Sequence, residues 1–200
     1  MPDRPGGTFL ICLRALLLLL WLPFAASTAS AAEVEVRNPQ LQATDDGYSL
    51  SADFVFEFNH RLEEAVSRGV ILYFVVDFEL SRARWYWLDE KLASRSLTLR
   101  LSYNALTRQY RLSSGALHQN FGSLEEAVRI LSRLRNWQVL DKSLALKHGD
   151  TYQAALRLRL DTSQLPKPFQ LTALANKEWN LASDWAAWPF TPSESREAGK

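Results

Sequence analysis

Residues 48–58 read YSLSADFVFEF, and large apolar side chains occupy nearly every second position of this stretch. Ser49, Ser51, Asp53 and Glu57 fall on the alternate positions. A period of two over eleven residues is typical of a β-strand with one buried face. Asp45-Asp46-Gly47, just before it, is a turn signal of the Asp-Gly hairpin type, and a second alternation begins at 33–36. We therefore predict a β-hairpin at the start of the domain.

Further strands are expected after this hairpin. Residues 70–76 (VILYFVV) are apolar on both faces, which favours a central strand, and Asp77 and Glu79 then make one face polar. Residues 97–103 alternate again, and a turn near 104–107 leads to a short strand at 109–112.

Two helices interrupt the strands. Asn59 is a suitable N-cap for a helix over 61–68 that ends at Gly69. Ser123 and Glu126 form a capping box, and apolar residues at helical spacing extend this second helix to about Arg135.

The C-terminal half predicts two more hairpins. The first pairs 137–146 with 152–160 around His148-Gly149-Asp150, with Arg157 and Arg159 facing outward. The second pairs 169–175 with 179–185. Eight or nine short strands with two short helices indicate a mainly β, α+β fold: an antiparallel β-sandwich or a curled sheet. Phe56 and Leu158 are expected in its core.

The first 32 residues have the order of a secretory signal peptide. Arg4 and Arg14 form a weakly basic start, residues 15–24 (ALLLLLWLPF) are apolar, and small residues follow. We predict cleavage after Ala31 or Ala32 and a periplasmic or secreted protein. The alternative is a retained membrane anchor, for which the apolar run is short, since a spanning helix needs about 20 apolar residues.

The composition is that of a globular protein, with 47% apolar and 22% charged residues. We expect one strand-rich domain over 33–192, a disordered tail over 193–200 and no transmembrane segment after signal cleavage. Removing residues 1–32 takes two of the 23 basic and one of the 22 acidic residues, so the formal net charge becomes zero. Nothing in that charge favours a nucleic-acid partner. The single cysteine, Cys12, would also be removed, leaving neither a disulfide nor a thiolate nucleophile.

Chemistry-bearing motifs are absent from the sequence. His60, His118 and His148 lie far apart and have no metal-ligand neighbour at the usual spacing. The sequence contains no phosphate-binding glycine loop and no nucleophile elbow. We therefore expect no catalytic residues, no cofactor and no metal, and a protein that is not an enzyme.

Two aromatic segments are candidates for a partner-binding surface. Arg82, Arg84 and Tyr86 share one face if residues 81–87 (SRARWYW) are extended, and arginine next to aromatic rings is a favourable combination. The alternative is an edge strand whose arginines pair within the protein. In the C-terminal segment, Trp179 and Trp185 are expected to close the core. For Trp188 the sequence favours neither the core nor a binding surface.

Several stretches together resemble a family of exported proteobacterial proteins that is defined as the domain of unknown function DUF4390. The resemblance covers nearly the whole mature chain and is carried by residues 62–65 before Gly69, 84–87 (RWYW), 103–110 (YNALTRQY), Phe121 with 123–127 (SLEEA), 160–161 before 165–166, and 178–179 with Ser183 and Trp185. It implies an envelope protein of unknown activity. The neighbourhood of the family's genes to those of a membrane sensor kinase implies that such a kinase is one candidate for its unknown envelope partner. The family supplies no catalytic residues.

Three functions compete on these grounds. The first is a non-enzymatic envelope interaction module, linked to envelope signalling through the resemblance. The second is a binder of an apolar ligand such as a lipid, in a cavity between sheet and helix. The third is an envelope hydrolase, which would require a cleft converging on Asp77, Glu79 or His118.

Overall fold

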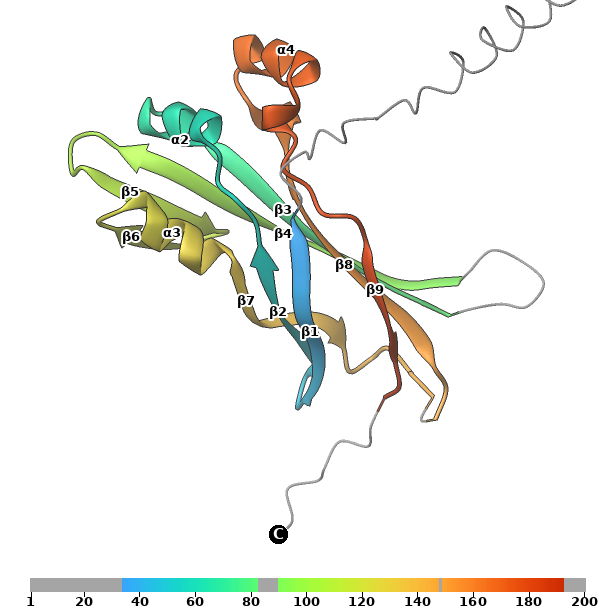
Figure 1. Ribbon diagram of the computed structural model, residues 1–200. Coiled ribbons are helices and arrows are strands. Elements are labelled where there is room, and N and C mark those ends of the chain that lie inside the picture. The colour runs from blue at the N-terminus through green and yellow to red at the C-terminus, as the bar shows by residue number, and fades with distance from the viewer. Residues whose placement is uncertain (1–33, 83–89, 148, 193–200) are drawn as a thin grey trace, which may run out of the picture. The chain divides into compact units, whose positions relative to one another are not determined.

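Two antiparallel sheets and three α-helices make up the described part of the chain (Figure 1). The computed structural model describes residues 34–82, 90–147 and 149–192. The expected signal peptide, the tail over 193–200, residues 83–89 and His148 lie outside the described residues. The expectation of a mainly β, α+β fold with antiparallel sheets is confirmed.

The smaller sheet has the strand order β1-β2-β7 and contains the predicted hairpin. Its strands are β1 (Glu35–Thr44), β2 (Gly47–Val55) and β7 (Arg133–Asp141). The Asp45–Gly47 turn joins β1 to β2, as expected. The pairing of β1 shifts register between Arg37 and Gln40, where Asn38 has a φ of 50° and Pro39 follows. The β1 edge is thus interrupted after its first few residues.

The larger sheet has the order β6-β5-β4-β3-β8-β9. Its bounds are β3 (Leu72–Arg82), β4 (Glu90–Asn104), β5 (Gln109–Ser114), β6 (Leu117–Phe121), β8 (Tyr152–Leu160) and β9 (Ala186–Phe190). As the apolar run over 70–76 predicted, β3 is central, between β4 and β8. Even-numbered residues of β3 and β8 face the core, while Asp77, Arg157 and Arg159 lie on the opposite face.

The core lies between the two sheets. Leu50, Ala52 and Phe54 of β2 and Phe74 and Leu158 of the larger sheet belong to one buried cluster. Leu158 is fully buried, as expected. The core assignment of Phe56 needs correction, since this residue lies just beyond the end of β2 and is only partly buried.

Helices α2 (His60–Ser67), α3 (Leu124–Leu131) and α4 (Lys167–Ala175) lie between strands. Asn59 caps α2 and Ser123 caps α3 through their side-chain oxygens, as predicted. Helix α3 ends at Leu131 rather than near Arg135, because Arg133 already pairs with Asp53 of β2.

Two predicted hairpins are wrong. Strands β7 and β8 do not pair with each other, because β7 pairs with β2 in the smaller sheet and β8 pairs with β3 and β9. The segment predicted as a strand over 169–175 is helix α4, with a proline in its first turn, where a missing N–H costs no helical hydrogen bond. The short 3₁₀ turns η1 (Thr162–Gln164) and η2 (Lys177–Trp179) flank this helix.

Candidate functional site

A groove of about 830 Å³ lies next to the starts of strands β1 and β9. It is open to solvent and is lined by three separate segments of the chain: Val34, Glu35 and Val36 at the start of β1; Val55, Phe56 and Glu57 at the end of β2; and Ser183, Asp184, Trp185 and Ala186 leading into β9. Its volume falls in the range of small-ligand pockets, which is roughly 300–1,000 Å³.

The groove lies at the starts of two edge strands, Glu35 and Val36 of β1 and Ala186 of β9, rather than across a sheet face. Successive side chains of a strand point to opposite faces, yet three or four consecutive residues of each segment line the groove. β1 has no strand partner other than β2, and β9 none other than β8, among the described residues. Two strand edges therefore border one opening.

The groove carries negative charge over an apolar lining. Glu35, Glu57 and Asp184 line it, together with valines, Phe56 and Trp185, and no lysine or arginine belongs to its lining. Glu35 is paired with Arg37 at 2.6 Å, and the hydrogen bond from Arg37 lowers the pKa of Glu35. Within the described residues, Glu57 and Asp184 have no ion-pair partner. The groove is thus suited to a positively charged ligand with apolar parts.

Trp185 lines the groove, and an arginine lies over its ring. Trp185 is 37% exposed, and the guanidinium of Arg157 on β8 lies 4.4 Å from the centroid of its ring. The core position expected for Trp185 is therefore wrong, whereas Trp179 is buried as expected. Ser183 fixes the segment to β8, because its backbone N–H donates to the Leu158 carbonyl at 2.8 Å and its hydroxyl accepts from the Leu158 N–H at 3.0 Å.

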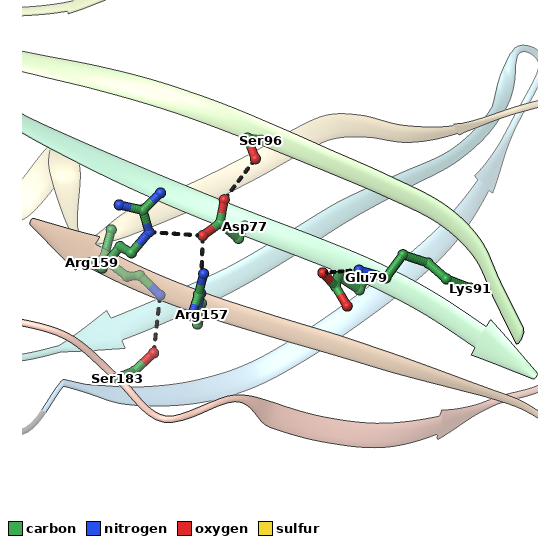
Figure 2. Close-up of polar contacts among 8 residues, drawn as sticks. Asp77, Glu79, Lys91, Ser96, Arg157, Arg159 and Ser183 are labelled. Atoms are coloured by element: carbon green, nitrogen blue, oxygen red, sulfur yellow. Dashed lines mark hydrogen bonds and ion pairs between the residues drawn. The ribbon is translucent and has the colours of Figure 1, made fainter. Parts of the chain in front are cut away.

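Asp77 positions Arg157 in turn (Figure 2). Its carboxylate accepts hydrogen bonds from Arg157 and Arg159 at 3.0 Å each and from the Ser96 hydroxyl at 2.7 Å. Burial opposes ionisation of Asp77, but the bonds from Ser96, Arg159 and Arg157 outweigh it and hold the pKa of this carboxyl below its usual value. Cross-strand neighbours on β3, β4 and β8 thus form one network that ends at Trp185.

Asp77, Glu79 and His118, the groups named for a hydrolase, do not converge on one cleft. Asp77 is bound by its three partners, and Glu79 is paired with Lys91 at 2.6 Å (Figure 2). His118 lies on β6, separated from β3 by β4 and β5. Among the described residues, no group of His, Cys, Asp and Glu side chains is arranged to hold a metal ion.

The partner surface predicted from the sequence is only partly visible. Arg82 pairs with Glu90 of the neighbouring strand at 2.7 Å, whereas Arg84 and Tyr86 lie outside the described residues. Trp188 is partly buried and packs against the core. The surface of Arg82, Arg84, Tyr86 and Trp188 therefore stays a prediction, and the groove lies at other residues.

Sequence reasoning missed the groove because its three segments are far apart in the chain. The sequence did contain a signal for the Asp77 network beside the groove: Asp77 on a central strand and the outward-facing Arg157 and Arg159 on another are charged positions on strands with an apolar core face. A buried carboxylate needs cationic partners, so these residues could have been paired.

The fold and groove define a class: an α+β protein with two antiparallel sheets and an acidic, partly apolar groove at the starts of two edge strands. The chain belongs to the family described as "Domain of unknown function (DUF4390)", whose match covers residues 31–189. Comparisons with curated proteins and with solved structures gave no match. Among the described residues, no helix has the length and apolar character needed to cross a membrane.

Proposed function

We propose that this protein is a non-enzymatic interaction module of the cell envelope, and that its groove binds an extended segment of a partner protein with basic and apolar side chains. The observation that carries the proposal is the groove itself, which is bordered by two strand edges and lined by three carboxylates and no cation.

Strand edges favour a polypeptide ligand. An unpaired edge offers backbone N–H and C=O groups to an additional strand, and pockets for alternate side chains then supply specificity. The groove has both parts, because the backbone of β1 borders it and Val36, Val55 and Phe56 provide apolar contacts. Glu57 and Asp184 select for lysine or arginine on such a segment.

The same features disfavour a lipid with an anionic head group. The carboxylates of Glu57 and Asp184, which have no ion-pair partner among the described residues, repel a phosphate or a fatty-acid carboxylate. An acyl chain is also best bound in an enclosed apolar cavity rather than in an open groove. Envelope localisation rests on the export signal expected in residues 1–32.

A charge-reversal experiment tests the proposal. The probe is a fluorescein-labelled peptide of alternating lysine and valine, and binding is followed by fluorescence anisotropy. We expect Glu57→Lys with Asp184→Lys to weaken binding by about tenfold or more, since two complementary charges become repulsive. The matched control is Glu125→Lys with Glu126→Lys, two carboxylates in the first turn of α3, which should bind like the natural protein.

The reciprocal arm uses a peptide of alternating glutamate and valine. It should bind the doubly reversed variant and not the natural protein. Equal lysine–valine binding by both variants would refute the proposed groove. Displacement of a fluorescent fatty acid from the natural protein, without binding of either peptide, would favour the apolar-ligand function instead.

A further inference from the structure

Helix α4 exposes two leucines that the rest of the fold leaves uncovered. The side chains of Leu171 and Leu174 are 72% and 86% exposed. The opposite side of the helix is used for packing: Phe169 lies 5.7 Å from the Trp179 ring, and Ala173 packs against the core. The helix is thus fixed in place by one side while its other side presents apolar residues to the surroundings.

Positive charge flanks these leucines. Lys167 begins α4 and Lys177 follows it, and α4 itself contains no acidic residue. Neither lysine forms an ion pair within the described residues. The nearest downstream carboxylate, Glu178, is already bound by Arg61 at 3.1 Å and by Asn176 at 2.8 Å. Leucines between two free ammonium groups match the layered chemistry of an anionic membrane surface, with acyl chains beneath phosphates.

The beginning of the domain lies at the same end as α4 (Figure 1). Glu35 of β1 pairs with Val55, from which the chain leads to Asn59, and the Asn59 amide donates to the carbonyl of Glu178 at 2.7 Å. These contacts place the start of β1 at the end of the domain that carries α4.

We propose that α4 docks on an anionic lipid surface, with Leu171 and Leu174 entering the boundary between head groups and acyl chains and with Lys167 and Lys177 at the lipid phosphates. This proposal is independent of the groove, because it rests on different residues and a different ligand.

A site-specific fluorescent label tests the docking whether or not residues 1–32 are retained. Leu171→Cys is introduced in the full chain together with Cys12→Ser, labelled with an environment-sensitive fluorophore and combined with vesicles of phosphatidylglycerol and phosphatidylethanolamine. The matched control is Leu106→Cys in the same background, since Leu106 is 97% exposed in the turn between β4 and β5.

We expect a blue shift at position 171, with quenching by bromine-labelled lipids at least about twice that at position 106, because the interfacial helix buries its apolar side. Lys167→Glu with Lys177→Glu should abolish the difference, and phosphatidylcholine vesicles should reduce it. Equal quenching at positions 171 and 106 would overturn the proposal. A blue shift that needs no vesicles and grows with protein concentration would also overturn it, in favour of a second copy of this chain.

Discussion

At the scale of single residues, Asp77 carries the most buried charge of the larger sheet. Its hydrogen bond from Arg157 links it to Trp185 in the lining of the groove. Its side chain is 11% exposed, whereas those of Arg157 and Arg159 are about one-third exposed (34% and 35%). The carboxylate therefore depends on its partners more than they depend on it, because the arginines can also be hydrated. Loss of this charge removes the support that orients Arg157 over Trp185.

We predict that Asp77→Asn lowers the free energy of unfolding by about 1–3 kcal/mol at pH 7, since hydrogen bonds to a buried charged group are lost. Glu79→Gln is the matched control: Glu79 lies on the same strand face, but its side chain is 32% exposed and has one ionic partner, so its loss should cost only about 0–1 kcal/mol. Urea unfolding gives both values, and equal midpoint shifts would contradict the assigned role of Asp77.

The pH dependence of this difference follows from the direction of the pKa shift. The pKa of Asp77 in the folded protein lies below the ordinary value near 3.8. Its contribution is thus complete above about pH 4 and is lost as the pH falls through the folded-state pKa. The gap in stability between the natural protein and Asp77→Asn should accordingly be constant from pH 5 to 7 and narrow at lower pH.

At the scale of elements, local pattern predicted strands well where one face is buried. The alternation in β2 and β8 was enough to assign both strands and the outward direction of Arg157 and Arg159. Which strands pair with each other was harder to predict from the sequence. The turn signal around residue 149 indicates a hairpin, whereas β8 buries more apolar surface by pairing with β3. That burial depends on contacts between residues far apart in the sequence, such as Asp77 and Arg157, which are 80 positions apart. A local sequence pattern contains no information about such contacts.

Helices were misassigned for a similar reason. The segment KPFQLTALA has apolar residues compatible with either structure, and the proline in the first turn was the only local indication of a helix. The end of α3 was misplaced because Leu134 falls on the same spacing as Leu131, although it is buried by β7 in the smaller sheet.

The β1–β2 turn offers a prediction at this scale. Gly47 has a φ of 134°, and a Cβ there would collide with the backbone carbonyl of Leu140 on β7. Gly115, with a φ of 56°, has open space around its Cβ position. We expect Gly115→Ala to cost about 1–2 kcal/mol from backbone strain alone. Gly47→Ala should cost clearly more, because β7 must also move. Thermal melting of the two variants checks this, and equal losses would mean that β7 yields easily.

At the scale of the whole molecule, the groove exists only because two sheets share one core. The lining residues come from positions 34–36, 55–57 and 183–186, and sequence alone contains no signal that these segments meet. The aromatic run over 81–87 drew attention instead, because its composition is conspicuous locally. Composition can identify an unusual segment, whereas a groove between sheets depends on how the complete core is packed.

A shared core predicts cooperative unfolding. Leu50 of β2 and Phe74 of β3 belong to the same buried cluster, so neither sheet keeps its buried face if the other unfolds. We expect the central amides of β2 and β3 to exchange with deuterium through the same global opening and with the same free energy, while the amides of α4 exchange faster. Faster exchange throughout β1, β2 and β7 would show that the smaller sheet opens separately.

The interruption of β1 has a consequence for solubility. A long, regular strand edge can add further copies of its own chain without limit, as in fibrils. Here the register shift between Arg37 and Gln40 with Pro39 inside it, and Pro189 near the end of β9, leave each edge only a short uninterrupted stretch beside the groove. Such a stretch can accommodate one short guest strand but offers no template for continued growth. The protein can therefore keep an open edge at high local concentration without polymerising through it.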